Sequence, residues 1–425
     1  MKLISITILG AILTLLRMAS GFLVAKFIAV YAGPTGMAMY GQLQSFVNGI
    51  NGLVTNQVGQ GIVRYTAENK KGDNYDLVSR WWKAATFLLL LLIGMFFPIF
   101  CLFSSELSTL LFNNNNYSWL IILTVSMLPF NVANNLLLSV LNGFEQNKKN
   151  IITSLISVII STSITLVMLY KYGIEGGLIS VAINNAIAGI IVIYRVRNEK
   201  WFTIRYWFGR TNKKHLKNIW MYILVGVVGA ATGPTALITI RNMLTESTSL
   251  IDTGIWQSMM KVSDAYIAMI ITGIGMYYFP KAASIKTSEE IKRLTVKTVS
   301  IVSIMVVFSA GTIFIMRDYV ISLLFDESFK NARELFLPQL TADFFRVVAY
   351  VPALIILAKG YFKVNMLLEI FINILLVVSS YFLIPKYGAL GVTYSWLITY
   401  VIYAILIFLF FLFHIKTLNK SCLNA

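Results

Sequence analysis

Long apolar stretches alternate with short polar ones along the whole chain. A helix needs about 20 predominantly apolar residues to cross the roughly 30 Å hydrocarbon layer of a membrane. The pattern supplies twelve such stretches and predicts an all-α integral membrane protein. The predicted spans are residues 3–30, 37–63, 84–103, 118–142, 151–170, 176–194, 218–242, 253–280, 298–317, 335–358, 364–384 and 387–413.

The second half of the chain repeats parts of the first at an offset of about 215 residues, close to half its length. Six helices per half give both halves the same orientation, so we predict two six-helix bundles related by a pseudo-twofold axis along the membrane normal. The bundles are residues 1–195 and 218–425, joined by a linker over 196–217. The matches are Lys171-Tyr172-Gly173-x-x-Gly176 with Lys386-Tyr387-Gly388-x-x-Gly391, Lys26 with Arg241, Gln42 with Gln257, and, at an offset of 213, Leu110-Leu111-Phe112 with Leu323-Leu324-Phe325.

The loops between the spans differ in their content of Lys and Arg. Twenty-five of these cations lie in the termini and in the loops on the same side, and five lie in the alternate loops. Because cytoplasmic loops carry the excess of Lys and Arg, both termini are predicted to be cytoplasmic. The longest such loop, 195–217, mixes cations with Trp and Phe and suits an interfacial amphipathic helix. We interpret it as a hinge linker; the alternative is a partner-binding segment.

Composition narrows the function further. The chain is 57% hydrophobic and 12% charged, with only two histidines and two cysteines. These are too few for a zinc, haem or iron–sulfur centre, so we expect no metal site and no cofactor. No phosphate-binding G-x-x-x-x-G-K-[S/T] loop or G-x-S-x-G elbow is present, and we expect no enzyme. The net charge of +17 is explained by the loop asymmetry and by anionic membrane lipids, so we infer no nucleic-acid partner.

The predicted span 37–63 is unusually rich in amides. Gln44, Asn48, Asn51 and Thr55 fall within about 60° of each other at 100° per residue, on one face of a helix. A lipid-facing helix cannot carry such a stripe, because each unpaired amide costs several kcal/mol in hydrocarbon. The stripe either lines a wet cavity, which we favour, or forms hydrogen bonds that hold neighbouring helices together.

Charged residues also occur inside the spans, where each costs about 3 kcal/mol to insert. Lys261 and Asp264 lie three residues apart, as do Asp343 and Arg346, so each pair can form an ion pair on its own helix. Glu369 lies near the inner end of its span.

Three further cations inside the spans, Arg17, Lys26 and Arg241, have no acid at helical spacing. Lys26 and Arg241 either reach the outer interface or line a cavity. Arg17 lies about 21 Å along its helix, too deep for such a reach. Unpaired cations in a wet cavity require an anionic ligand. The planar fork of arginine matches phosphate oxygens, which favours a phosphate or a diphosphate.

Several motifs resemble those of one family. They are Arg17-x3-Gly21-x4-Lys26, Ala29-Val30 and Gly33-Pro34-x-Gly36, then the segments 61–68 and 141–150, and the two Tyr-Gly-x-x-Gly turns. In this order they are similar to Wzx-type translocases of the MOP superfamily, which flip undecaprenyl-diphosphate-linked O-antigen or enterobacterial common antigen units. The chain departs from the peptidoglycan-precursor branch, which usually has fourteen spans.

The resemblance implies a MOP/MATE-like fold in a bacterial inner membrane, and a flippase that carries lipid-linked oligosaccharide to the periplasmic leaflet by alternating access. It also implies cooperation with a polysaccharide polymerase and a chain-length regulator. The acids Asp264 and Asp343 become candidates for coupling to H⁺ or Na⁺. The candidate substrate-binding cations are Arg17, Lys26, Arg64, Arg241, Lys261 and Arg346.

Other functions remain open at this stage. A multidrug antiporter of the same superfamily would need unpaired acids and aromatic residues to hold cationic drugs, whereas the spans carry a surplus of cations. A membrane-embedded polysaccharide polymerase would need a sizeable outward loop, and the predicted outward loops are short. An anion channel is the third alternative.

Overall fold

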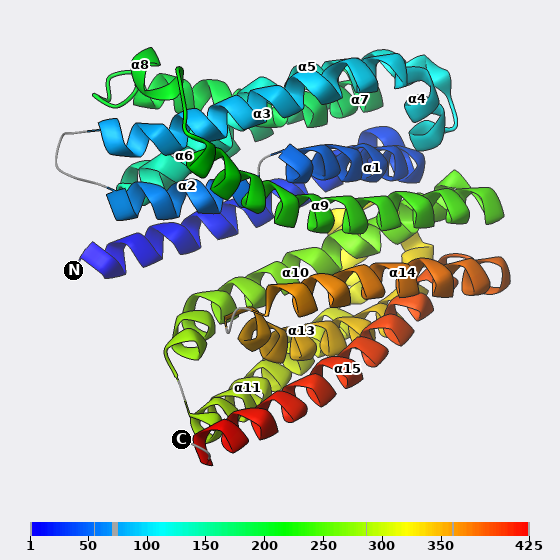
Figure 1. The fold of residues 1–425 in the computed structure, drawn as a ribbon. Coiled ribbons are helices and arrows are strands. Elements are labelled where there is room, and N and C mark those ends of the chain that lie inside the picture. Colours follow the sequence, from blue (N-terminus) through cyan, green and yellow to red (C-terminus); the bar gives the residue numbers. More distant parts are fainter. Residues whose placement is uncertain (1, 55, 70–74, 286, 359–360, 424–425) are drawn as a thin grey trace. The chain divides into compact units, whose positions relative to one another are not determined.

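The computed structural model describes residues 2–54, 56–69, 75–285, 287–358 and 361–423. Within these ranges every regular element is a helix, and no strand occurs (Figure 1). The prediction of an all-α protein is confirmed.

The chain divides into two compact units. The first comprises residues 1–32 and 39–238, and the second comprises 33–38 and 239–425. The elements before the boundary are α1 (Lys2–Val54), α2 (Asn56–Asn69), α3 (Asp76–Leu102), α4 (Ser104–Phe112), the 3₁₀ helix η1 (Asn115–Tyr117), α5 (Ser118–Ser126), α6 (Leu128–Gly143), α7 (Asn147–Val196) and α8 (Ile204–Trp207).

Helix α9 (Lys213–Ser247) contains the boundary between the units, which lies between Ile238 and Thr239. From the sequence we placed the start of the second bundle at residue 218. The division of the chain into two bundles of six helices stays a prediction. The elements of the second unit are α10 (Leu250–Ser284), α11 (Ser288–Ile315), α12 (Arg317–Leu324), the 3₁₀ helix η2 (Glu327–Leu335), α13 (Phe336–Ala358), α14 (Phe362–Tyr387) and α15 (Ala389–Leu423).

Two of the longest elements are each two helices joined at a glycine. Gly33 in α1 has φ 61° and ψ −164°, and Gly173 in α7 has φ 55° and ψ −137°. Among the described residues, nine helical stretches are long and apolar enough to cross a membrane, and two of them contain these glycines. Helix α10, which covers the predicted span 253–280, is not among the nine. If these two stretches are each divided at their glycine and α10 is added, the nine stretches become twelve, which is consistent with the twelve predicted spans.

The repeated Tyr-Gly-x-x-Gly sequence forms the same turn in both units. Gly388, the counterpart of Gly173, has φ 56° and ψ −131°. The second glycine of each motif packs against a carbonyl group eight residues earlier. A Cβ atom on Gly176 would lie 2.1 Å from the Met168 oxygen, and one on Gly391 would lie 2.3 Å from the Leu383 oxygen. The backbone thus repeats as the sequence does, because only glycine fits at both positions.

The linker does not form the interfacial amphipathic helix that its sequence suggested. Only the four residues of α8 are helical between α7 and α9. Trp201 and Trp207 are 1% and 8% exposed. Both contact Trp82 of α3, with ring centroids 5.9 Å and 5.2 Å apart. The prediction was wrong because the aromatic side chains find partners in the first unit, and the linker folds onto that unit.

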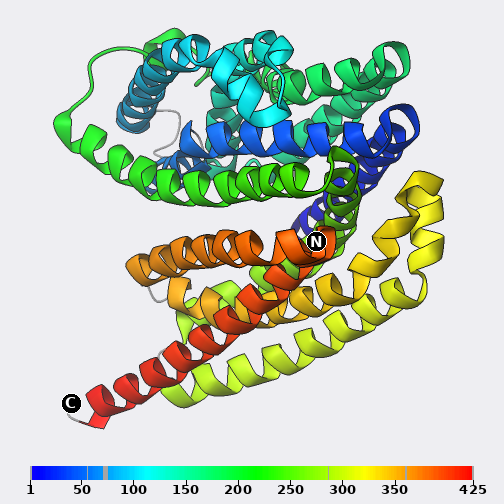
Figure 2. The same cartoon turned by 90° about the vertical axis from the view of Figure 1, so that its right-hand side faces the viewer.

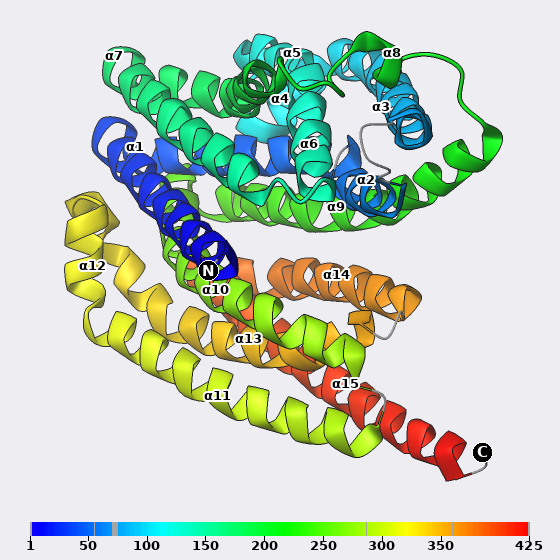
Figure 3. The ribbon, with the colours of Figure 1, turned by 90° about the vertical axis from the view of Figure 1, so that its left-hand side faces the viewer.

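The second unit is a bundle in which α13 packs against α10, α11 and α15, and α14 packs on α15 (Figure 2 and Figure 3). Its main apolar core combines residues of α10, α11, α13 and α15, among them Ile267, Val306 and Val351. The first unit has a separate core of its own, built around residues of α1 to α7. Each unit therefore positions its own polar side chains.

The turn glycines generate the first prediction. Gly176→Ala and Gly391→Ala place a methyl group against a backbone carbonyl, and such overpacking costs about 1–3 kcal/mol. We expect the purified, detergent-solubilised variants to unfold at lower temperature than the unmodified protein. Gly94→Ala is the matched control, since a Cβ there meets no atom within 4 Å. A Gly176→Ala protein as heat-stable as Gly94→Ala would contradict the shared turn.

Candidate functional site: a cavity at Arg17 and a buried polar network

Arg17 is an exposed residue of α1 and lines a cavity of about 200 Å³ in the first unit. The cavity is formed by α1 and by both parts of α7, and it is more polar than a helix interface requires. Its polar lining consists of Arg17, Ser20, Tyr40, Ser161, Thr162, Thr165, Ser180 and Asn184.

Most of the hydroxyl groups on α7 already donate to the main chain. Ser161 donates to the Val158 oxygen at 3.3 Å, and Thr165 donates to the Ser161 oxygen at 2.8 Å. Ser180 likewise donates to the Gly177 oxygen at 2.7 Å. These bonds satisfy the side chains without a neighbouring helix, and they leave the hydroxyl oxygens able to accept hydrogen bonds.

The guanidinium group gives the cavity its charge. Within the part of the chain that the structure describes, Arg17 forms no ion pair and Asn184 forms no hydrogen bond. The cavity therefore offers a fork of N–H donors with a positive charge, an amide, and several hydroxyl acceptors. This combination can bind a phosphate group together with hydroxylated parts of the same ligand.

The other candidate cations of the first unit do not join Arg17. Lys26 lies further along α1, is half-buried, and does not line the cavity. Arg64 is exposed and donates from Nε to Glu68 Oε1 at 2.8 Å. The charge of Arg64 is therefore neutralised by Glu68 on the same helix, α2.

Of the two uses that the sequence left open for the amide stripe, the structure shows the hydrogen bond between helices at Asn51. The side-chain amide of Asn131 on α6 donates to Asn51 Oδ1, so Asn51 holds two helices together. Asn48 is exposed and Gln44 is half-buried, and neither lines the Arg17 cavity. Thr55 lies outside the described residues.

In the second unit, a network of hydrogen bonds surrounds Asp343 of α13. Its side chain is fully buried, at 0% exposed. Ser263 Oγ and Tyr266 Oη on α10 donate to its Oδ2 at 2.7 Å and 2.8 Å. Gln339 Nε2, one turn earlier on α13, donates to Oδ1 at 3.0 Å. Three donors thus replace water around a buried carboxyl group.

The ion pair in this region joins two helices. Arg346 Nη1 on α13 lies 3.5 Å from Asp264 Oδ1 on α10. The guanidinium group also lies over Trp396 and Tyr400 of α15, 5.4 Å and 5.6 Å from the ring centroids. The sequence suggested an intrahelical pair of Asp343 with Arg346, but Asp343 instead receives the three neutral donors. Side chains from the neighbouring helix and from one turn earlier thus contact Asp343 in place of the residue three positions later.

Arg241 does not reach an outer interface, because it is 5% exposed. Its Nε and one terminal nitrogen donate to Gln257 Oε1 of α10 at 3.0 Å and 2.8 Å. The guanidinium group lies 5.7 Å from the Trp256 ring centroid. Lys261 follows one turn later on α10 and is half-buried. Arg241 and Arg346 thus both lie close to an acceptor and to aromatic rings.

The hydroxyl and amide residues of the Arg17 cavity were not predicted from the sequence. A weak signal exists in α7, where Ser157, Ser161 and Thr165 recur every four residues and so share one helix face. Tyr40 and Asn184 carry no comparable signal, because their proximity to Arg17 arises only when the two parts of each long element fold back.

Comparison with known proteins links the chain to polysaccharide biosynthesis. A family described as "Polysaccharide biosynthesis protein" matches residues 3–285. The lipid III flippases of Escherichia coli (strain K12) and Shigella flexneri are each 27% identical over 391 residues, covering 92% of this chain and 93% of each relative.

Solved structures establish the fold. A multidrug resistance MATE family transporter of the MOP superfamily, in an inward-facing conformation, has a TM-score of 0.80 at 14% identity, with 96% of this chain and 99% of that chain covered. The lipid II flippase MurJ has a TM-score of 0.70 at 15% identity, with 96% and 87% covered. The predicted MOP/MATE-like fold of a multi-pass membrane protein is confirmed.

The network around Asp343 generates the second prediction. Asp343→Ala leaves three buried donors without an acceptor, and we expect a loss of about 3 kcal/mol or more in the free energy of unfolding. Asp343→Asn keeps an oxygen acceptor and should lose less. Asp318→Ala, which breaks an exposed ion pair with Arg333, should cost less than about 1 kcal/mol. Unfolding of the purified proteins in detergent measures all three, and equal losses for Asp343→Ala and Asp318→Ala would show that the network contributes nothing.

Proposed function

The chain belongs to the polysaccharide biosynthesis protein family, and on that basis we propose that it is a flippase for lipid-linked oligosaccharides. Its cargo is an undecaprenyl-diphosphate-linked repeat unit of O-antigen or a related surface polysaccharide, carried from the cytoplasmic to the periplasmic leaflet. The similarity to two lipid III flippases over 92% of the chain supports this choice of substrate class.

The observation that carries the proposal is the Arg17 cavity. A lipid-linked oligosaccharide presents a diphosphate next to a hydroxylated sugar. In the cavity, a cation without a carboxylate partner among the described residues lies beside hydroxyl and amide groups. Arg17 binds phosphate oxygens through its fork of N–H donors. The oxygens of Ser161, Thr165 and Ser180 accept hydrogen bonds from the sugar.

Transport then proceeds by alternating access, in which the head group is bound from one face of the membrane and released at the other. The polyprenyl tail stays in the lipid throughout, because moving its apolar surface into water would be costly. Only the polar head group must be sheltered from hydrocarbon. Binding energy at Arg17 replaces the hydration that the diphosphate loses.

Two alternatives have less support. A multidrug antiporter shares the fold, but the positive charge of Arg17 in the cavity lining would repel cationic drugs. A polysaccharide polymerase needs groups that activate a sugar hydroxyl. The acid in the best-defined polar network, Asp343, is fully buried, which does not suit an enzyme that acts on a bulky glycan.

The excess of cations in one set of loops supports an inner-membrane orientation with both termini in the cytoplasm. In that orientation the flippase would deliver its product to a polysaccharide polymerase and a chain-length regulator.

The third prediction concerns Arg17. In reconstituted vesicles, Arg17→Ala should reduce flipping of a fluorescent lipid-diphosphate oligosaccharide about tenfold or more, because a charge-assisted hydrogen bond contributes about 1.5–3 kcal/mol. Arg17→Lys should restore part of the rate, since it keeps the charge but loses the fork. In a strain that depends on this gene, surface polysaccharide should fall in the same order.

Arg210→Ala serves as the control for this experiment. Arg210 is an exposed arginine of the linker, so its loss changes the net charge equally without touching the cavity. Undiminished flipping by Arg17→Ala, with wild-type protein active in the same vesicles, would refute the role of the cavity.

We also propose that flipping is coupled to H⁺ or Na⁺ through Asp264 or Asp343. Asp264 pairs with Arg346, and Asp343 lies on the same helix as Arg346, so a change in the charge of either acid alters the electrostatic balance around this arginine.

The fourth prediction tests the coupling. An imposed proton or sodium gradient should accelerate flipping by the unmodified protein. Asp264→Asn or Asp343→Asn should abolish the acceleration, while Asp76→Asn, at an exposed ion pair with Arg205, should keep it. Thermal unfolding of each variant separates lost coupling from lost folding. If the unmodified protein ignores both gradients, the acids are structural.

A further inference from the structure

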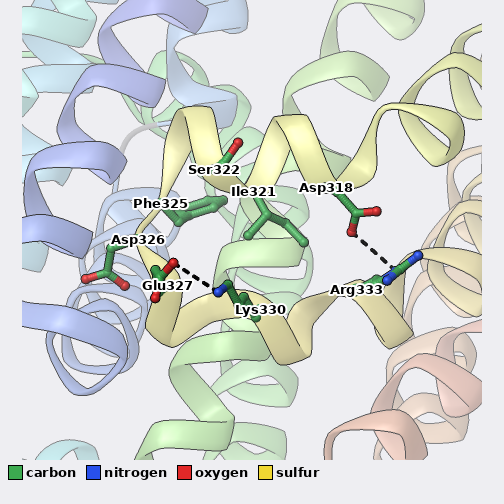
Figure 4. Close-up of a pocket in the computed structure, with 8 residues that line it drawn as sticks. All are labelled: Asp318, Ile321, Ser322, Phe325, Asp326, Glu327, Lys330 and Arg333. Atoms are coloured by element: carbon green, nitrogen blue, oxygen red, sulfur yellow. Dashed lines mark hydrogen bonds and ion pairs between the residues drawn. The ribbon is translucent and has the colours of Figure 1, made fainter.

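A second and larger cavity lies in the second unit, between α12 and η2. It has a volume of about 480 Å³, within the roughly 300–1,000 Å³ typical of small-molecule sites. Figure 4 shows Ile321 and Phe325 between the two helices, with charged side chains to either side. Both apolar residues are only 4% exposed, so they form the floor of the pocket. None of these residues belongs to the sites described above.

Charged groups of both signs form the rim. Arg333 Nε lies 3.2 Å from Asp318 Oδ1, and Lys330 Nζ lies 3.0 Å from Glu327 Oε1 (Figure 4). Asp326 Oδ1 accepts from the Ser328 amide at 3.0 Å. The four side chains of the two ion pairs are more than half exposed, and such pairs are worth about 1 kcal/mol or less. A ligand can therefore exchange these bonds for its own at little cost.

The internal repeat shows that the fold does not require this pocket. At the offset of 213 residues, Ile321 corresponds to Ser108 of α4. Ser108 is fully buried, donates to the Asn114 oxygen at 2.5 Å and accepts from the Tyr117 amide at 3.2 Å. That hydroxyl closes the turn of the first unit. Isoleucine cannot make either bond, and the charged segment η2 replaces the asparagine-rich turn.

We infer that the α12–η2 pocket binds a sugar ring of the transported oligosaccharide, an inference that rests on the proposed function. A pyranose ring has an apolar face of C–H groups, which matches the Ile321 and Phe325 floor. Its hydroxyl groups can donate hydrogen bonds to the carboxylates of the rim and accept them from the rim lysine and arginine. Three rim acids against two cations disfavour a phosphate, so the ligand is the glycan and not the diphosphate.

The position of the pocket in the chain fits a role at the exit. The loop count places residues 317–334 on the side opposite both termini, where the glycan emerges. Weak binding there would hold the sugars outside while the diphosphate leaves its site. The α12–η2 pocket thus adds a glycan subsite that is separate from the phosphate site at Arg17.

The experiment measures direct binding of free sugars by the full-length protein in detergent. Saturation-transfer NMR with chitotriose and with maltotriose should show transfer to ring C–H protons for at least one of them. Ile321→Trp fills the pocket and should abolish the transfer. Glu327→Gln removes a charged acceptor without adding bulk and should weaken binding about tenfold. Glu334→Gln, an exposed acid on η2 outside the pocket, is the matched control and should bind like the unmodified protein.

Arg17→Ala tells the two sugar-contacting sites apart, because transfer from the α12–η2 pocket should survive it. Transfer that Arg17→Ala abolishes and Glu327→Gln leaves unchanged would overturn the inference, as would no transfer from either sugar. Those results leave the proposed function intact if the vesicles still flip lipid-linked oligosaccharide. Sugar binding that depends on Glu327, in a protein that flips no such lipid, would instead refute the proposed function.

Discussion

A charged or amide side chain inside a membrane must meet a partner or water, and this constraint explains where the polar residues of the protein lie. Inserting a charge costs about 3 kcal/mol even on the lenient scale. The second unit meets that cost with acceptors and aromatic rings. Arg346 lies beside Asp264 and over two rings of α15, and Asp343 receives three donors. These contacts join α10 to α13, because Ser263, Tyr266 and Asp264 of α10 supply partners for Asp343 and Arg346 of α13.

The first unit solves the same problem differently. Asn51 and Asn131 satisfy each other, and the hydroxyl groups of α7 donate to their own helix. Arg17 has no carboxylate among the described residues, so its charge must be met by water or by a ligand. Arg17 thus differs from Arg241 and Arg346 of the second unit, whose guanidinium groups lie beside an acceptor and aromatic rings.

The sequence predicted those features that depend on local pattern. Hydropathy predicted an all-α protein of long apolar helices, and the Tyr-Gly-x-x-Gly motif marks a turn that recurs in both units, because each depends on residues close in the chain. The amphipathic helix of the linker and the pairing of Asp343 with Arg346 were predicted incorrectly, since Trp201 packs on Trp82 and Arg346 pairs with Asp264 across helices. Distances along one helix cannot reveal such partners. Of the residues that line the Arg17 cavity, the sequence predicted only Arg17 itself. Tyr40 and Asn184 come close to it only when the chain folds.

The likeness to a multidrug transporter, at a TM-score of 0.80, raises the question of what decides the cargo on a shared fold. The scaffold cannot decide it, since the lipid II flippase MurJ is also similar. The polar side chains that line the cavity can decide which cargo is carried. A cationic drug needs acids or aromatic faces, whereas the Arg17 cavity offers a guanidinium group and hydroxyl oxygens. This lining suits an amphiphile with an anionic, hydroxylated head group. Its donors and acceptors offset the free-energy cost of removing such a head group from water.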